Sequence, residues 1–302
     1  MTSRIPIPLA DVFVDLRVLD FLELTGSQVR AAAALAMHQS TVSRCLQRIG
    51  DQFDLHEGPG RGPDRYGTNA SLCLLRQAYR AHRLMRGRLR IGTDLLHQPL
   101  LNGLAAVEPV PPRFRSQPEW KRLIADGLLD GAVVATGHRP PAETGDQACL
   151  PLGSLGLRLV RASAGRASAG QRCVLVPGRS KAPDLHAQLV QRGWRLEVQP
   201  HQCLEADDWL HRSRQQQLAL PLVPALLGAA WLRRQGLQMV DDPPLTEHLW
   251  LLLPGPRPAG LHPPSAAGLL LSALRQRLQA RCDREVLAMA PVVAPSRTPT
   301  PG

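Results

Sequence analysis

The sequence predicts an α+β protein of more than one domain: a helical N-terminal unit, a linker helix and a two-lobed α/β domain. Apolar residues recur at helical spacing through residues 15–86. From residue 88 onward, short runs that can form strands alternate with amphipathic segments, the pattern of a parallel sheet covered by helices. A length of 302 residues allows two or three domains, and a hydrophobic content of 44% indicates a globular chain.

The helical unit contains two short helices with a tight connection, within residues 28–49. In the first, Val29 and Leu35 lie on the apolar side, and four successive alanines from Ala31 let two helices cross closely. The second begins near Ser40, a good N-cap, and its inward face is Val42, Cys45, Leu46 and Ile49. A helix over residues 15–24 is expected to complete a three-helix core.

The other face of the second helix is polar and carries no acid. It offers hydroxyl, amide and guanidinium groups, from Gln39, Ser40, Thr41, Ser43, Arg44, Gln47 and Arg48. Such a face suits a helix in the DNA major groove, where arginine reaches guanine and hydroxyls reach phosphates. The net charge of +11 also favours a polyanionic partner. The alternative is an amphipathic helix pair with no DNA partner.

The residue pattern of this segment resembles the helix-turn-helix of LysR-type transcriptional regulators. The shared positions are Ser27, Ala31, Ala32, Leu35, Gln39, Ser40, Ser43 and Arg44. The resemblance implies a winged helix-turn-helix domain over residues 12–65 that binds double-stranded DNA, with Arg61 and Arg65 in the wing. The family's Leu-Phe-x-Arg strand is replaced by residues 54–57, and Ser71 replaces the glycine of its Thr-x-x-Gly. A flexible loop with two solvated arginines is the alternative to a DNA-contacting wing.

Residues 66–88 are expected to form a linker helix that Thr68 caps. A seam for pairing with another helix recurs at spacings of 3, 4, 3 and 3, in Leu72, Leu75, Tyr79, His82 and Met85. The other face is basic, with Arg76, Arg80, Arg83 and Arg86. The family uses this helix as an antiparallel dimerisation arm, so the resemblance implies a homodimer or homotetramer. The alternative is a helix folded back on its own domain.

Two further segments are similar to the family's effector-binding domain, namely residues 89–92 (Leu-Arg-Ile-Gly) and the strand that begins at Leu129. The resemblance implies two lobes like those of type II periplasmic binding proteins. The first lobe would comprise residues 89–160 and 255–282, the second residues 161–254, and a disordered tail residues 283–302. A strand is also expected over residues 110–115.

A small-molecule effector is expected between the lobes, at the carboxyl ends of strands. In the family, hydroxyl side chains after the first and third strands often hold an anionic effector, which makes Thr93, Thr136 and His138 candidates here. Asp94 has the wrong charge for an anion, and the two leucines that follow it are apolar. We therefore expect a neutral or weakly polar effector, or none. Solvated loop residues are the alternative.

The sequence contains no motif of an enzyme, and we expect no catalytic residues and no cofactor. A nucleophile elbow, a P-loop, a dinucleotide-binding glycine motif and a His-Glu-x-x-His pair are all missing, and no histidines and acids cluster as metal ligands. Six scattered cysteines suit a reducing cytoplasm, and no apolar run is long enough for a membrane span.

The hypothesis is therefore a cytoplasmic LysR-like regulator whose sequence-specific DNA binding is controlled by a small molecule. The alternative is a degenerate paralogue or ligand-binding module that keeps the fold without specific DNA binding, which the altered wing favours.

Overall fold

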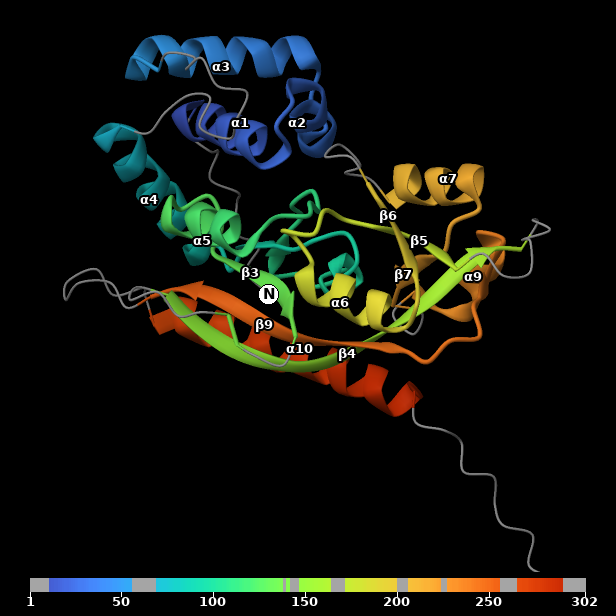
Figure 1. The fold of residues 1–302 in the computed structure, drawn as a ribbon. Helices are drawn as coiled ribbons and strands as arrows, with labels where there is room; N and C mark the ends of the chain where they lie inside the picture. Colours follow the sequence, from blue (N-terminus) through green and yellow to red (C-terminus); the bar gives the residue numbers. More distant parts are fainter. Residues whose placement is uncertain are drawn as a thin grey trace, which may run out of the picture.

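The N-terminal unit is a bundle of three helices around one small core. The computed structural model describes residues 11–55, 69–137, 140–141, 147–163, 172–199, 206–223, 227–255 and 265–289. The helices are α1 (Asp11–Thr25), α2 (Gln28–Leu35) and α3 (Gln39–Phe53), joined by turns at Gly26 and Ala36 (Figure 1). Apolar side chains from all three meet in this core, among them Leu16, Ala31 and Val42. The three predicted helices are confirmed, with α3 starting one residue before Ser40.

The linker helix α4 (Ala70–Met85) continues from this bundle toward the α/β domain (Figure 1). Asn69 caps it: its side-chain oxygen accepts a hydrogen bond from the amide of Leu72 at 2.8 Å. The side-chain amide of Asn69 donates to the carbonyl of Phe53, also at 2.8 Å, so the start of α4 is tied to the end of α3. The expected cap, Thr68, lies outside the described residues.

The α/β domain is built on a mixed sheet, with the strands in the order β2-β1-β3-β9-β4-β7 and β8 paired with β4. The strands are β1 (Leu89–Gly92), β2 (Val107–Glu108), β3 (Gly131–Thr136), β4 (Gln147–Ala162), β7 (Leu220–Leu222), β8 (Leu237–Met239) and β9 (Leu245–Pro254). Strand β1 is parallel to β2 and β3, whereas β9 is antiparallel to both β3 and β4. The expectation of a parallel sheet is confirmed for β1, β2 and β3 and is wrong for the rest of the sheet, because the chain leaves along β4 and returns beside it along β9.

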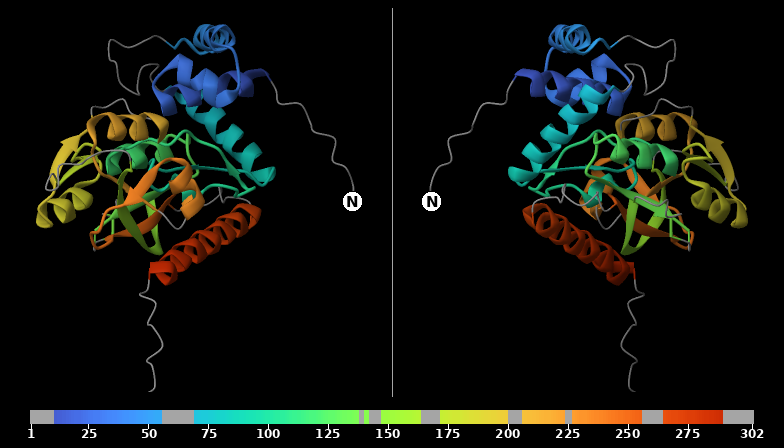
Figure 2. Two further views of the ribbon diagram at one scale, coloured as in Figure 1. Left: turned by 90° about the vertical axis from the view of Figure 1, so that its right-hand side faces the viewer. Right: turned by 90° about the vertical axis from the view of Figure 1, so that its left-hand side faces the viewer.

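A second, two-stranded parallel sheet consists of β5 (Cys173–Val176) and β6 (Arg195–Val198). The helices of the domain are α5 (Gln117–Ala125), α6 (Pro183–Gln191), α7 (Ala206–Gln216), α9 (Ala229–Arg234), α10 (Ser265–Met289) and the 3-10 turn η1 (Gln98–Leu100). Helix α10 packs along β4, at the end of the molecule opposite α3 (Figure 2). Residues 283–289, expected in the tail, belong to this helix, and residues 290–302 lie outside the described residues.

The strand expected over residues 110–115 is absent, and β2 ends at Glu108 instead. Pro109, Pro111 and Pro112 have no backbone N–H, so this segment cannot supply the regular donors of a ladder. It keeps a single backbone bond to the neighbouring chain, from the amide of Arg113 to the carbonyl of Thr93 at 3.1 Å. The segment therefore runs as irregular chain from β2 to α5.

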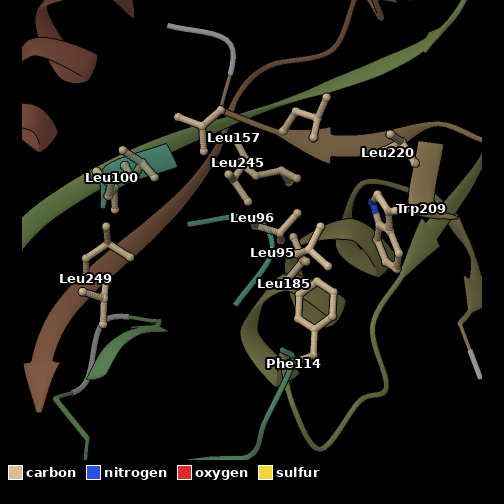
Figure 3. Packing of buried hydrophobic residues seen from close by; sticks show 14 of the residues in the cluster. Leu95, Leu96, Leu100, Phe114, Leu157, Leu185, Trp209, Leu220, Leu245 and Leu249 are labelled. Atoms are coloured by element: carbon tan, nitrogen blue, oxygen red, sulfur yellow. The ribbon is translucent and has the colours of Figure 1, made fainter. Parts of the chain in front are cut away.

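A large apolar core extends through the α/β domain, and a second, smaller cluster lies between α5, β3 and β9. Leu95, Leu96 and Phe114 come from the segments after β1 and β2 and face Leu185 of α6, as Figure 3 shows. The ring of Phe114 lies 5.4 Å from that of Trp209 in α7. Because the buried apolar residues are continuous and β9 pairs with β3, the division into two lobes at residues 160 and 254 stays a prediction.

Candidate nucleic-acid interface and effector cavity

Helix α3 presents a polar surface on the outside of the molecule. We define the exposed face of α3 as Gln39, Ser40, Ser43, Arg44 and Gln47, all of which are exposed. Thr41 is half-buried, and an acid, Asp51, follows one turn beyond Gln47. Figure 1 shows α3 as the element farthest from the sheet. The structure thus leaves this face open to a partner.

The opposite face of α3 anchors the helix to the bundle. Val42 and Ile49 are no more than 1% exposed, and Cys45 and Leu46 are buried beside them. Burial raises the pKa of the Cys45 thiol to about 11, and Asp15 adds to this effect. Cys45 is therefore a neutral packing residue at neutral pH, and the buried face of α3 packs on the bundle.

The two arginines of α3 have different surroundings. The Nε atom of Arg44 donates to the carbonyl of Ser40, in its own helix, at 3.3 Å. Arg48 instead forms a two-pronged ion pair with Asp15 of α1, in which Nε and Nη2 each lie 2.5 Å from a carboxylate oxygen. Asp15 is buried, whereas the Arg48 side chain is 51% exposed. Arg48 thus fastens α3 to α1, and a DNA contact from it stays a prediction.

Three of the sequence-predicted residues lie outside the described residues. They are Arg61 and Arg65 of the expected wing and His138 of the expected effector pocket. Their roles stay predictions.

A cavity of about 350 Å³ lies between the segment after β1, the end of β3 and the starts of α5 and α6. Thr136 lines it, as the sequence predicted for an effector pocket, whereas Thr93 is buried and is not part of the lining. Apolar walls come from Leu96, Phe114 and Leu185.

Asp94 borders the cavity, but its charge is engaged within the chain. Its Oδ1 atom accepts from the backbone amides of Leu96 and His97, at 2.9 and 3.1 Å. The two ring nitrogens of His97 lie 2.8 Å from Asp94 and 2.7 Å from Glu247 of β9. Although burial opposes the charged form, the two carboxylates raise the pKa of His97 to about 10, so His97 is an imidazolium that donates to both. His97 was not among the residues predicted from the sequence, in which its local mark is its position three residues after an aspartate.

Two cations that line the cavity, Arg115 and Lys181, were also not predicted from the sequence. Arg115 is 6% exposed, and its Nη2 atom donates to the backbone carbonyl of Leu24, near the end of α1. Burial and the neighbouring Arg113 lower the pKa of Arg115 to about 9. Burial likewise lowers the pKa of Lys181, and Glu119 opposes this effect. No local pattern marks Arg115, because its partner is 91 positions away in the sequence.

The seam predicted on α4 is covered by the chain itself. Leu72 and Tyr79 are buried in the core of the bundle, and Leu75 packs against it. Phe13 of α1 stacks on Tyr79 at 5.4 Å and on His82 at 6.0 Å. Most of this seam therefore packs on the helical unit of its own chain, as the alternative of a folded-back helix expected, and pairing of two chains through α4 stays a prediction.

The basic face of α4 is largely buried as well. Arg76 pairs with Asp20 and Glu23 of α1, at 3.0 and 2.7 Å, and Arg80 and Arg83 pair with Asp130 before β3. The exposed apolar residues of α4 form a different stripe. We define this linker stripe as Leu74, Ala78, Ala81 and Met85, of which Leu74 is 66% and Met85 74% exposed.

Fold and site together define a two-part chain: a three-helix unit of helix-turn-helix form with an open polar face, joined by a helix to an α/β domain that holds a cavity. Within the described residues, no helix could cross a lipid bilayer, and no three metal-binding side chains come together.

The chain is similar to several solved structures. ArgP from Mycobacterium tuberculosis is 18% identical over 87% of this chain and 96% of its own, with a TM-score of 0.44. A full-length OxyR variant from Pseudomonas aeruginosa is 11% identical over 91% and 96%, with a TM-score of 0.45. DarR from Vibrio fischeri, solved in complex with DNA and described among LysR-type (LTTR) family members, is 13% identical over 89% and 99%, with a TM-score of 0.42. No protein-family model and no curated protein sequence matches the chain.

Proposed function

We propose that this chain is a LysR-type transcriptional regulator that binds double-stranded DNA through the exposed face of α3, under the control of a small molecule in the cavity. The observation that carries the proposal is the exposed face itself. It is polar, free of acids from Gln39 to Gln47 and outermost in the fold, while the opposite face is locked into the bundle.

In this proposal α3 lies in the major groove. Arg44 and Gln47 have the donors and acceptors that read guanine and adenine edges, and the hydroxyls of Ser40 and Ser43 suit phosphate oxygens. The ion pair between Arg48 and Asp15 holds α3 against α1 in the free protein. DNA binding therefore costs less conformational entropy than it would if α3 had to be ordered on binding.

The proposal includes a homodimer or homotetramer formed through α4. Because Leu72 and Tyr79 of the predicted seam are buried in their own chain, the apolar surface of α4 left for a partner is the linker stripe, which includes Met85 of that seam. A two-fold dimer would carry two α3 helices to two half-sites of one operator.

The test is DNA binding by the full chain and two variants. Specific and random duplexes are titrated in a gel-shift assay at several salt concentrations, with Arg44→Ala and, as a control, Arg277→Ala on the exposed side of α10. We expect Arg44→Ala to weaken specific binding by about 1–3 kcal/mol and random-duplex binding less. Arg277→Ala should change neither.

Equal losses on both duplexes would make Arg44 a phosphate contact only. If the wild-type chain prefers no sequence, the alternative of a paralogue without specific DNA binding replaces this proposal.

A further inference from the structure

A groove of about 160 Å³ lies where the helical unit meets the α/β domain. The end of α1 and one side of α2 bound it on one side, and the irregular chain between β2 and α5 bounds it on the other. Figure 1 shows α2 at the same end of the molecule as α3. We define this α2 groove by its lining, which is Leu24, Thr25, Arg30, Ala33, Ala34, Pro111, Pro112 and Arg113. None of these residues lines the cavity at the end of β3.

Within the described part of the chain, the charged side chains of this lining are two arginines, one from each side of the groove. Arg30 is the third residue of α2, and Arg113 belongs to the segment before α5. The other residues are apolar apart from Thr25, whose hydroxyl donates to two backbone carbonyls at 2.7 and 3.1 Å. The described lining therefore carries positive charge and no acid.

The guanidinium of Arg113 has no hydrogen-bond acceptor and no ion-pair partner among the residues that the structure describes. Its backbone amide donates to the carbonyl of Thr93 at 3.1 Å, which fixes the start of the side chain. Its Nη1 atom lies at the turn between α1 and α2, 3.0 Å from the place where a Cβ atom of Gly26 would stand. The side chain is half-buried, so a ligand that supplies acceptors would be favoured.

The charges around Arg113 add to this preference. Burial lowers the pKa of Arg113, Glu119 opposes this effect, and Arg30 adds to it by repulsion. The carboxylate of Glu119 is engaged at the start of α5, where its Oε2 atom accepts from the amide and the hydroxyl of Ser116, at 2.7 and 2.8 Å. An anion placed between the two arginines would add attraction to both of them.

The size of the groove limits the anion to a small one. A volume of about 160 Å³ lies below the roughly 300–1,000 Å³ of sites that hold a metabolite or a drug-sized ligand. The tetrahedral phosphate group is small, and guanidinium groups bind it through paired, charge-assisted hydrogen bonds. DNA is one source of such a group, because the first helix of a helix-turn-helix crosses the DNA backbone while the second lies in the major groove. Free phosphate is the other source.

We propose that the α2 groove binds one phosphate group, held by Arg113 of the α/β domain together with Arg30 of α2. The chemistry of the site is the same whether the phosphate belongs to the DNA backbone or is free in solution. With DNA as the source, the inference rests on the proposed function and adds a contact from the α/β domain to those of α3. Such a contact positions the protein on the duplex and carries no sequence information.

The first experiment measures the DNA affinity of the full chain at several salt concentrations, with specific and random duplexes. With DNA as the source, Arg113→Gln weakens binding to both duplexes by the same factor. The slope of log K against log salt falls in magnitude by about 0.9, the value for one lost phosphate contact. Arg113→Lys keeps the charge and should keep the slope. The control is Arg277→Gln on the exposed side of α10, which should leave affinity and slope unchanged.

The second experiment measures the melting temperature of the full chain in sodium phosphate and in sodium chloride at equal ionic strength. With free phosphate as the source, the wild type and Arg277→Gln melt at a higher temperature in phosphate, because a ligand that binds only the folded state stabilises it. Arg113→Gln loses this difference between the two salts. Its DNA affinity and salt slope then equal those of the wild type.

Ala33 offers a test that leaves both arginines in place. It is exposed on α2 and lines the groove. Ala33→Glu adds a carboxylate to the lining, whereas Ala33→Gln adds a side chain of nearly the same shape without charge. We expect Ala33→Glu to lose more of the phosphate-dependent effect than Ala33→Gln does. This pair of variants decides the question if Arg113→Gln does not fold.

The proposal is overturned if Arg113→Gln behaves like Arg277→Gln in both experiments. If Arg113→Gln does not fold, equal behaviour of Ala33→Glu and Ala33→Gln in both experiments overturns it. The ratio of specific to random binding tests the proposed function separately. A chain that prefers one sequence but shows no effect of Arg113→Gln keeps the proposed function without this site. A chain that prefers no sequence but shows the expected effect of Arg113→Gln keeps the phosphate site without the regulator.

Discussion

Arg44 and Arg48 lie about one helical turn apart on α3, yet only Arg48 is held by an acid of the bundle. Asp15 is 1% exposed, so Arg48→Ala would leave a buried carboxylate without its partner. We expect this change to lower the midpoint of urea denaturation clearly below that of the wild type. Arg44→Ala is the matched control and should leave stability within about 0.5 kcal/mol of the wild type. Equal stability of the two variants would contradict the assignment of Arg48 to the fold.

His97 gives the stability of the α/β domain a particular pH dependence. Its pKa is about 10 in the folded chain, above the ordinary value of about 6.5. A raised pKa means that the stabilisation is fully present below about pH 6.5 and is lost as the pH rises through about 10. We expect His97→Gln to be less stable than the wild type at pH 7 and the difference to shrink between pH 7 and pH 10.

Melting temperatures of the two proteins at pH 7, 8, 9 and 10 measure this difference. Groups that titrate equally in both proteins cancel. A constant difference across that range would show that His97 is not the imidazolium described here.

At the scale of elements, α4 decides how copies of the chain could associate. The buried side of α4 carries Leu72 and Tyr79, and the linker stripe stands on its exposed side. We expect Leu74→Asp combined with Met85→Asp to give monomers in analytical ultracentrifugation, with the circular dichroism spectrum unchanged. The matched control is Gln77→Asp combined with Arg88→Asp, also exposed but outside the stripe.

If the mass of the stripe variant equals that of the wild type, association through this side of α4 is contradicted. If the control variant also sediments as a monomer, the dissociation is caused by the added negative charge and not by loss of the linker stripe.

Local sequence patterns predicted the elements of the chain better than their contacts. The periodicity of α1 to α4 and the apolar runs of β1 and β3 were sufficient to place these elements. The role of Arg115 was not predictable, since Leu24 is 91 positions away, and neither was that of His97, since Glu247 is 150 positions away. The exposed face of α3 follows directly from helical spacing, which is why its residues could be named in advance and the cavity's cations could not.

At the scale of the whole molecule, buried ion pairs join the helical unit to the α/β domain. Asp20 of α1 pairs with Arg76 of α4 and with Arg90 of β1, at 3.0 and 2.9 Å, and all three residues are at most 1% exposed. Arg90 also pairs with Glu108 of β2 at 3.0 Å. Separating the two parts of the chain would leave these buried charges without partners, which is energetically costly. The ion pairs therefore hold the helical unit and the α/β domain in one arrangement.

The central claim is that the exposed face of α3 reads a DNA sequence, and selection from a randomised duplex pool tests it most directly. Rounds of binding by the full chain, followed by sequencing, should enrich a motif, and a two-fold dimer should make that motif palindromic. The same selection with Arg44→Ala should lose or relax a position that the wild type specifies. A pool that stays random after selection with the wild type, under salt conditions where it binds DNA, would contradict the account.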